Sequence, residues 1–308
     1  MKIGFLFPGQ GTQCVGMGKD LYDTYKEVRD VYDEFFKITG IDVAKLTFES
    51  SEEELMQTKN TQIAILVMSL GILKVLETNN IYADVGAGLS LGEYTALIYS
   101  KAFSFEDGVK LVQKRGEYMQ NLLPKGEWGM AAILGADEKI VSDICGKVTS
   151  GFVIPVNFNC PGQIAVSGEK KAVLEAIEIA KEFEVKKAVE LNTSGPFHTV
   201  KLQDAANALK QELDSITIDK PKCDVVKNLD GEVYSESDNV KDVLYRHMIS
   251  PVRFDKCIAK MLDMGVDIFV EIGPGKTLTS FVKRANKEVK LININDVTSL
   301  KNAIDIIG

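Results

Sequence analysis

Short apolar runs that end at glycine-containing turns recur along the chain, and a longer segment with helical periodicity follows each of them. Ile3–Phe7 and Ile268–Ile272 both end at a turn that contains proline and two glycines. A weaker run of small residues, Ala83–Ala87, leads into Gly88. Short apolar runs of this kind are typical of buried strands. Their alternation with helical segments predicts an α/β fold with a mainly parallel sheet.

The helical segments are recognised by apolar residues at intervals of three and four. Thr61–Leu76 contains the longest apolar run, eleven residues from Ile63 to Leu73. This run is too short to span a bilayer and predicts a helix that is covered on both sides. The chain start breaks at a Pro-Gly turn after five apolar residues, so we expect no signal peptide and a cytosolic protein. The other predicted helices are Leu21–Phe36, Leu91–Ser100, Phe105–Asn121, Val200–Leu213, Val240–Ile249 and Phe254–Met264.

The middle of the chain has a different order of elements. Strand, helix, strand, strand, helix and strand follow one another there, and this βαββαβ order predicts a ferredoxin-like unit. We therefore predict a small domain of residues 128–191 inserted into a large α/β domain of residues 1–127 and 192–308. The six elements are Met130–Leu134, Asp137–Lys147, Phe152–Asn157, Gln163–Ser167, Glu169–Phe183 and Lys187–Leu191.

Charge and composition exclude several classes of protein. The 36 basic and 44 acidic residues give a net charge of −8, which disfavours a general attraction to nucleic acid or to anionic membranes. A local basic patch stays possible. The five cysteines include no CxxC pair and the chain has only two histidines, which argues against a disulfide framework and a zinc site. We expect no metal and no cofactor.

The strongest chemical signal is the sequence Gly88-Leu89-Ser90-Leu91-Gly92. Glycines on either side of a serine permit a tight strand-to-helix turn that exposes the hydroxyl at a helix N-terminus. Backbone N–H groups at such a turn can stabilise an oxyanion. The alternative interpretation is an ordinary glycine-containing turn with a capping serine. A strand is predicted before this serine and a helix after it, which favours a nucleophile.

Two histidines could serve as the base for such a serine. His198 follows an irregular segment, Asn192–Phe197, and precedes a helix, a placement that is typical of catalytic groups. His247 lies on a predicted helix beside Val243 and Leu244, which favours a packing role. We therefore favour His198 as the base.

An arginine on an apolar helix face is the third candidate. Arg115 shares a face with Leu111, Tyr118 and Met119. Such an arginine either extends its head to solvent or pairs with a buried anion. A bound carboxylate would match its planar fork of donors.

Five further sequence motifs follow one another along the chain. They are Phe7-Pro8-Gly9-Gln10-Gly11, Gly88-Leu89-Ser90-Leu91-Gly92-Glu93-Tyr94, Lys114-Arg115-Gly116, Pro155-Val156-Asn157-Phe158-Asn159 with Pro161-Gly162-Gln163, and Glu271-Ile272-Gly273-Pro274-Gly275-Lys276. In this order they resemble the motifs of the malonyl-CoA:acyl carrier protein transacylases, the loading enzymes of fatty acid biosynthesis. The resemblance covers essentially the whole chain. It implies an α/β-hydrolase-like large domain that carries the inserted small domain.

The resemblance also implies the roles of individual residues. Ser90 would be the acylated nucleophile and His198 its base. Arg115 would hold the malonyl carboxylate, and the backbone N–H groups of Gln10 and Leu91 would form the oxyanion hole. The substrates would be malonyl-CoA and the phosphopantetheine thiol of holo acyl carrier protein, used in two half-reactions without a metal or a redox cofactor.

Two further features of the family concern the surroundings of the serine and the histidine. A backbone carbonyl from the segment His247–Pro251 would orient the catalytic histidine. The family commonly has a histidine directly before the nucleophile, where this chain has Leu89. The serine–histidine pair does not depend on that position, but the turn would lose a polar neighbour. Phe197 resembles the bulky residue that accompanies malonyl selectivity in related synthase domains.

Two rival functions share part of this pattern. A thioesterase or carboxylesterase of the α/β-hydrolase type would have the same serine turn, but it would not explain the inserted βαββαβ unit. A non-catalytic docking module for carrier protein would not need Ser90, His198 and Arg115. For docking of an acidic carrier protein, the candidate basic residues are Lys276, Lys283 and Arg284.

Overall fold

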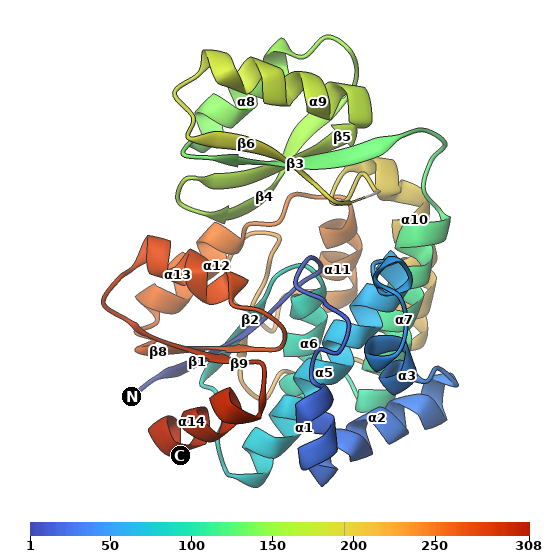
Figure 1. The fold of residues 1–308 in the computed structure, drawn as a ribbon, viewed down its shortest axis with the longest axis vertical. Helices are drawn as coiled ribbons and strands as arrows, with labels where there is room; N and C mark the ends of the chain where they lie inside the picture. The colour runs from blue at the N-terminus through green and yellow to red at the C-terminus, as the bar shows by residue number, and fades with distance from the viewer. Residues whose placement is uncertain (194) are drawn as a thin grey trace.

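Two separate sheets organise the computed structural model, which describes residues 1–193 and 195–308 (Figure 1). The larger sheet has the strand order β7-β2-β1-β8-β9, and all neighbouring strands in it are parallel. The predicted mixed α/β class with a parallel sheet is confirmed. Its strands are β1 (Ile3–Phe7), β2 (Val85–Gly88), β7 (Asp224–Val226), β8 (Ile268–Ile272) and β9 (Lys290–Ile294).

Helices cover both faces of the parallel sheet. Phe5 and Phe7 of β1 pack into the larger core on one face, whereas Leu6 between them packs into a second core on the other face. This alternation follows from the two-residue repeat of a strand, and it explains why β1 is apolar at every position. The larger core contains residues of α5 and α6, and the second core contains residues of α12 and α13.

The helices of the large unit include some that the apolar periodicity did not predict, among them the short helices α3 and α4 and the eleven-residue helix α14. A 3-10 turn at Val200–Leu202 precedes α10, where the sequence predicted one continuous helix. The bounds are α1 (Lys19–Thr24), α2 (Lys26–Thr39), α3 (Val43–Phe48), α4 (Glu52–Leu55), α5 (Thr58–Thr78), α6 (Leu91–Tyr99), α7 (Phe105–Asn121), α10 (Gln203–Ser215), α11 (Val240–Met248), α12 (Phe254–Asp263), α13 (Thr277–Ala285) and α14 (Val297–Ile307).

Helix α5 runs through the middle of the large unit (Figure 1). With 21 residues and a mean hydropathy of 1.5 over its most apolar window, it is the one helix of the described chain that could span a membrane by length and composition alone. However, 83% of that window is buried inside the protein. The neighbouring helices and β8 therefore account for its apolar surface, as predicted for a helix covered on both sides.

The single helix predicted over Leu21–Phe36 is wrong, because the structure breaks it into α1 and α2. Tyr25 between them has extended backbone angles of φ −106° and ψ 125°. Arg29 of α2 donates from Nη1 to the carbonyl oxygens of Tyr22 and Asp23, at 2.7 and 3.0 Å. These bonds satisfy carbonyl groups that the end of α1 leaves without helical partners.

The smaller sheet is antiparallel, with the order β4-β5-β3-β6. Its strands are β3 (Trp128–Leu134), β4 (Val153–Cys160), β5 (Gln163–Glu169) and β6 (Lys187–Leu191). Helices α8 (Glu138–Lys147) and α9 (Lys170–Ile179) lie on the face that points away from the large unit (Figure 1). The elements follow one another in the predicted βαββαβ order, with a 3-10 turn (Ala180–Glu182) after α9.

Strand β4 connects the small sheet to the large unit. The backbone N–H of Phe158 donates to the carbonyl of Val252 at 2.9 Å, and the N–H of Val252 donates to the carbonyl of Val156 at 2.7 Å. The guanidinium of Arg253 lies 4.2 Å from the centre of the Phe158 ring. These contacts fix the small sheet above the carboxyl ends of β1 and β2, where the candidate site lies.

Candidate active site

A tight turn between β2 and α6 carries the predicted nucleophile. Ser90 has φ 54° and ψ −99°, and a positive φ is uncommon for a residue with a side chain. A Cβ added to Gly88 would lie 1.9 Å from the backbone of Gly92, and one added to Gly92 would lie 2.0 Å from the carbonyl oxygen of Phe7. The spacing of the two glycines thus lets the start of α6 lie directly against the ends of β1 and β2.

The structure brings Ser90 and His198 together from positions 108 residues apart. Ser90 Oγ lies 2.8 Å from His198 Nε2, and His198 Nδ1 lies 3.1 Å from the carbonyl oxygen of His247. Because a carbonyl only accepts, we assign the ring proton to Nδ1, which leaves Nε2 free to accept from the serine hydroxyl. Burial and the nearby Arg115 cation lower the pKa of His198 to about 4, so the ring is neutral at physiological pH.

His247 contacts the predicted base through its backbone. Its side chain is fully buried, and its ring is stacked on that of His198 with the centroids 5.2 Å apart. Nδ1 lies 3.5 Å from Glu93 Oε2, yet neither ring nitrogen makes a hydrogen bond within the described chain. Burial and the neighbouring His198 and Arg115 hold the pKa of His247 well below its usual value. A neutral packing side chain with a functional carbonyl fits these contacts.

Arg115 on α7 is buried at the bottom of the site and is only 1% exposed. Nη2 donates to Ser90 Oγ at 3.0 Å, and Nη1 donates to Gln62 Oε1 at 2.7 Å. The guanidinium also lies 5.0 Å from the centre of the Tyr94 ring. Burial lowers the pKa of Arg115, and no carboxylate among the described residues forms an ion pair with it. A desolvated cation beside the nucleophile can therefore receive an anion.

A cavity of about 410 Å³ lies between the two sheets, and the predicted catalytic and substrate-binding residues line its wall. The loop after β1 reaches this cavity because Gly9 passes close to Leu89, and a Cβ on Gly9 would lie 2.5 Å from the Leu89 carbonyl oxygen. Leu91 begins α6, so its N–H belongs to the first helical turn, whose N–H groups lack intrahelical acceptors. The lining includes Gln10, Ser90, Leu91, Arg115 and His198 from the large unit and Met130, Asn157, Asn159, Ala165 and Leu191 from the small one.

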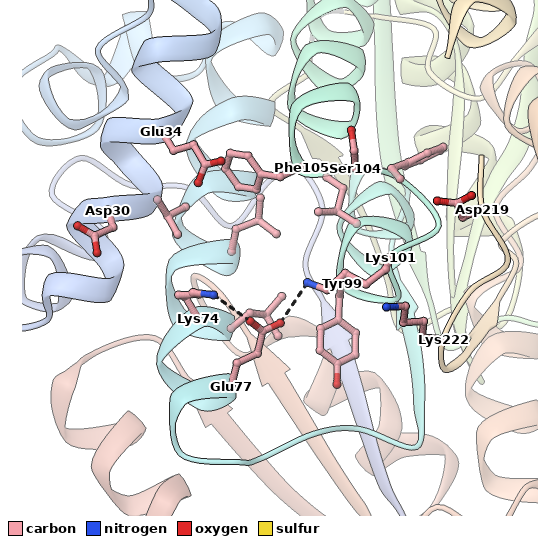
Figure 2. Close-up of a pocket in the computed structure, with 15 residues that line it drawn as sticks. Asp30, Glu34, Lys74, Glu77, Tyr99, Lys101, Ser104, Phe105, Asp219 and Lys222 are labelled. Carbon is pink, nitrogen blue, oxygen red and sulfur yellow. Dashed lines mark hydrogen bonds and ion pairs between the residues drawn. The ribbon is translucent and has the colours of Figure 1, made fainter. Parts of the chain in front are cut away.

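A second cavity, of about 400 Å³, lies elsewhere on the large unit and shares no lining residue with the first. Figure 2 shows that Lys74 and Lys101 both point toward Glu77. Glu77 accepts from Lys74 at 3.5 Å and from Lys101 at 3.3 Å. Among the residues that the structure describes, no serine–histidine pair lines it. We therefore assign the chemistry to the first cavity.

Three residues to which the sequence analysis gave no role support the predicted groups, directly or through one another. Gln62 binds Arg115, as described above. Asn228 contacts the backbone of the serine turn, and Glu93 contacts Asn228 in turn. Asn228 lies 138 residues from Ser90 and follows a strand of only three residues, so no local sequence signal indicated it. Leu89 packs into the second hydrophobic core, and Asn228 supplies the turn with polar contacts instead.

Two other features that the sequence analysis considered are the irregular segment before His198 and a metal site. Ser194, which belongs to the irregular segment predicted before His198, lies outside the described residues. Nowhere in residues 1–193 and 195–308 do three histidine, cysteine or acidic side chains come together as ligands for a metal ion.

Comparisons with known proteins match nearly the full length of the chain. A family model described as an acyl transferase domain matches residues 4–303. The chain is 42% identical to a malonyl CoA-acyl carrier protein transacylase of Bacillus subtilis (strain 168), in an alignment that covers 98% of this chain and 96% of that protein.

Solved structures give the same result at the level of the fold. A crystal structure of malonyl CoA-acyl carrier protein transacylase from Clostridium perfringens has a TM-score of 0.95 and 43% identity, and the match covers 99% of this chain and 97% of that one. A malonyl-transacylase in complex with its type II PKS acyl-carrier protein has a TM-score of 0.95 and 34% identity, with 99% and 100% covered. Both sheets and the cavity between them therefore belong to the matched region.

Proposed function

Because the chain belongs to the acyl transferase family, with malonyl CoA-acyl carrier protein transacylases among its full-length relatives, we propose that it transfers malonyl from malonyl-CoA to acyl carrier protein. The observation that carries this proposal is a convergence on one atom. Ser90 Oγ lies 2.8 Å from a neutral histidine nitrogen and 3.0 Å from a buried arginine nitrogen. A nucleophile, a base and a cation at one point suit a substrate acyl group that ends in a carboxylate.

In the first half-reaction, Ser90 Oγ attacks the thioester carbonyl carbon of malonyl-CoA. His198 Nε2 takes the hydroxyl proton as the new C–O bond forms. The tetrahedral intermediate then collapses, the C–S bond breaks, and the coenzyme A thiolate leaves with the proton that His198 returns. The product is a malonyl ester of Ser90. The low pKa of His198, about 4, supports this step because it keeps Nε2 unprotonated before substrate binds.

In the second half-reaction, the phosphopantetheine thiol of the carrier protein enters the same cavity. His198 Nε2 takes the thiol proton, the sulfur attacks the ester carbonyl, and the C–O bond to Ser90 breaks. The serine oxygen recovers the proton from His198, so the enzyme returns to its starting state. Two sequential transfers at one serine give ping-pong kinetics.

The backbone N–H groups of Gln10 and Leu91 are the candidates for the oxyanion hole. Leu91 directly follows the nucleophile at the first turn of α6, where both the free N–H groups and the helix dipole favour a negative charge. Gln10 follows Gly9, whose close approach to Leu89 brings the loop to the serine turn. Donors on both sides of Ser90 would stabilise the developing oxyanion of either half-reaction.

Arg115 is the candidate for recognition of the malonyl carboxylate. A buried guanidinium without a carboxylate partner offers a planar pair of donors, and a bound carboxylate would neutralise it. The pairing would also orient the thioester carbonyl toward Ser90, because the same guanidinium contacts Oγ.

The carrier protein is proposed to dock beside α13. Lys276, Lys283 and Arg284 are all exposed, while Thr277 and Phe281 of the same helix line the cavity. A basic surface at the mouth would offset the repulsion between an acidic carrier protein and a chain with a net charge of −8.

We also infer the finer classification of the fold. The order β4-β5-β3-β6, with both helices on one face, supports a ferredoxin-like small domain of residues 128–191. The parallel sheet with a serine turn after β2 supports an α/β-hydrolase-like large domain of residues 1–127 and 192–308. We also propose that the protein works in fatty acid biosynthesis and that it is located in the cytosol.

Incubation with radiolabelled malonyl-CoA tests this function against the two rivals. Transfer of label to holo carrier protein, with little free malonate, supports the transferase. Rapid release of malonate without carrier protein would instead indicate a hydrolase. A protein that binds carrier protein but takes up no label would be a docking module, and the proposal would be wrong.

A further inference from the structure

The peptide that carries Ser90 is held by a side chain from a distant part of the chain. Asn228 Oδ1 accepts a hydrogen bond from the Ser90 backbone N–H at 2.7 Å. The Nδ2 of the same amide donates to the carbonyl oxygen of Gly88, also at 2.7 Å. One fully buried amide therefore pairs with the backbone on both sides of Leu89, as a neighbouring strand would do.

This pairing acts where the backbone is least stable by itself. Ser90 has a positive φ of 54°, and a residue with a side chain keeps such a conformation only when the surrounding structure enforces it. The direction of Oγ toward His198 Nε2 depends on that conformation, because the peptide angles determine where the Cα–Cβ bond points. The two bonds from Asn228 restrain the peptide at Ser90 itself and at Gly88, two residues before it.

The backbone of Asn228 is held as firmly as its side chain. Its N–H donates to Glu93 Oε2 at 3.0 Å, and its carbonyl accepts from the N–H of Arg253 at 2.7 Å. Glu93 is fully buried on α6, the helix that begins directly after Ser90, and it also accepts from Tyr234 Oη at 2.6 Å. The contacts form a closed ring from the serine turn along α6 to Glu93, then to Asn228 and back to the turn.

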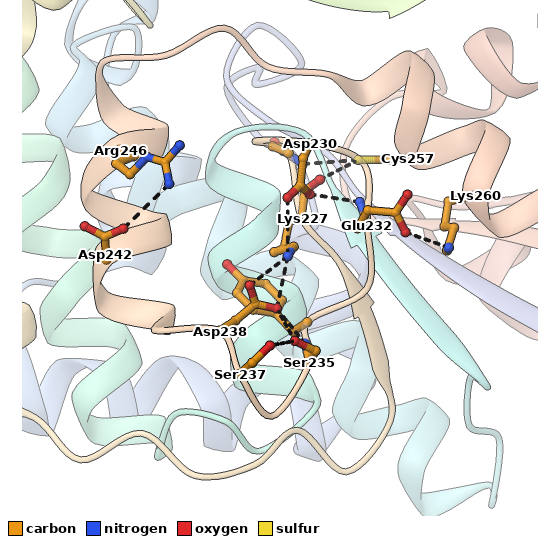
Figure 3. A network of polar contacts seen from close by, with 12 residues as sticks. Lys227, Asp230, Glu232, Ser235, Ser237, Asp238, Asp242, Arg246, Cys257 and Lys260 are labelled. Carbon is orange, nitrogen blue, oxygen red and sulfur yellow. Dashed lines mark hydrogen bonds and ion pairs between the residues drawn. The ribbon is translucent and has the colours of Figure 1, made fainter.

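The loop that presents Asn228 is braced by its own polar contacts, which Figure 3 shows. Lys227 Nζ lies 3.0 Å from both carboxylate oxygens of Asp238 and 3.4 Å from Asp230. Asp238 in turn accepts from the Ser235 N–H at 2.7 Å. The Lys227 side chain is only 6% exposed, so the cation of these pairs is shielded from solvent. Asn228 is thus presented from a fixed loop after β7.

We propose that Asn228 is a positioning residue for acyl transfer, which clamps the serine turn so that Ser90 Oγ faces His198, and that Glu93 anchors the clamp. This inference rests on the proposed function, because it takes Ser90 as the nucleophile. Asn228 acts through the backbone of the turn, whereas Arg115 and the cavity walls bind the substrate. Loss of the clamp should therefore slow acylation and leave malonyl-CoA binding nearly unchanged.

The test compares Asn228→Ala with a control that also removes a buried hydrogen bond. Tyr99→Phe removes the bond from the Ala83 N–H to the Tyr99 hydroxyl, at the far end of α6 from Ser90. For each variant, the acylation rate constant and the malonyl-CoA dissociation constant come from single-turnover labelling at several substrate concentrations. Mass spectrometry identifies the labelled residue, and a thermal melt reports folding.

Asn228→Ala is expected to slow acylation roughly 10- to 100-fold, as a misplacement of about 1 Å would do, while the dissociation constant changes less than roughly threefold. The acylation rate constant of Tyr99→Phe should stay within roughly threefold of the wild-type value, even if its melting temperature falls as far as that of Asn228→Ala. Asn228→Asp provides a second variant of nearly the same shape. It keeps an acceptor for the Ser90 N–H but turns a carboxylate oxygen toward the Gly88 carbonyl, and it should slow acylation by roughly tenfold or more.

Acylation of Ser90 at the wild-type rate in a folded Asn228 variant would overturn the clamp and leave the proposed function intact. The clamp would also be overturned if the Asn228 variants changed only the dissociation constant for malonyl-CoA, or if Tyr99→Phe slowed acylation as much as they do. If the wild type carried no malonyl group on Ser90, the proposed function itself would fail, and the clamp with it. If Asn228→Ala does not fold, the same criteria apply to Asn228→Asp.

Discussion

Replacement of Arg115 by alanine should change which acyl group the protein transfers. Malonyl and acetyl differ by one carboxylate, and removal of a carboxylate from water is costly unless a partner replaces its hydration. Removal of one partner of a buried, hydrogen-bonded charge pair costs roughly 2 to 5 kcal/mol. At about 1.4 kcal/mol for each factor of ten, malonyl transfer should lose between roughly 30-fold and several thousand-fold in kcat/KM.

Acetyl transfer should be retained or should rise, because the emptied pocket then suits an uncharged group. Arg115→Lys should recover little malonyl transfer, since an ammonium cannot reproduce the planar fork that contacts both Gln62 and Ser90. Lys114→Ala is the matched control, because Lys114 has the same charge on the same helix but is partly exposed and pairs with Glu117 at 3.0 Å.

The assay is kcat/KM for malonyl-CoA and for acetyl-CoA on each Arg115 and Lys114 variant, with folding checked by thermal melt. The ratio of the two substrates is the informative quantity, because a general loss of structure lowers both. Equal losses on the two substrates would show that Arg115 has a structural role, and recognition of the carboxylate would then need another explanation.

Four further predictions concern the catalytic base, the pH dependence of activity, the pH dependence of stability and the docking surface. His198→Ala should slow acyl-enzyme formation by roughly two or more orders of magnitude, whereas His247→Ala should mainly lower the melting temperature. If labelling assays gave the reverse result, the assignment of His198 as the base would be wrong. Because burial lowers the pKa of His198 from 6.5 to about 4, the acid limb of kcat/KM for malonyl-CoA should fall well below 6.5, and a midpoint near 6.5 would contradict the assignment. Because of the same shift, the unfolded chain takes up a proton at His198 between pH values of about 6.5 and 4, whereas the folded chain does not. The free energy of unfolding of the wild type should therefore decrease relative to that of His198→Gln as the pH falls through this range, which urea titrations at several pH values measure. Charge reversal at Lys283 and Arg284 should raise the KM for carrier protein and leave malonyl loading unchanged, and an unaltered KM at low salt would exclude this docking surface.

The parts of the fold that the sequence predicted are those whose signal is local. The bounds of α7 were predicted to the residue, because Ser104 caps the helix by accepting from the Asp107 N–H and the apolar periodicity continues to its end. The bounds of β1 and β8 were also predicted to the residue, because each is a short buried strand that ends at a turn of proline and glycines. The glycines of the serine turn were recognisable because the turn requires them sterically.

The parts that the sequence did not predict depend on partners far along the chain. Strand β7 has only three residues, and its pairing with β2 rather than its own sequence makes it a strand. The break at Tyr25 follows from the contacts of Arg29 with the carbonyl groups of α1, which no propensity at Tyr25 indicates. Asn228 is an ordinary polar residue before a turn in the sequence, and its contacts with the serine turn appear only once the fold is complete.

Identification of the acylated residue tests the central claim most directly. The wild-type protein is incubated with malonyl-CoA, digested, and examined by mass spectrometry before and after addition of holo carrier protein, with Ser90→Ala treated in parallel. We expect a single malonyl group on Ser90 that disappears when the carrier thiol is added, and no modification of Ser90→Ala. A malonyl group on another residue, or transfer to carrier protein by Ser90→Ala at the wild-type rate, would contradict it.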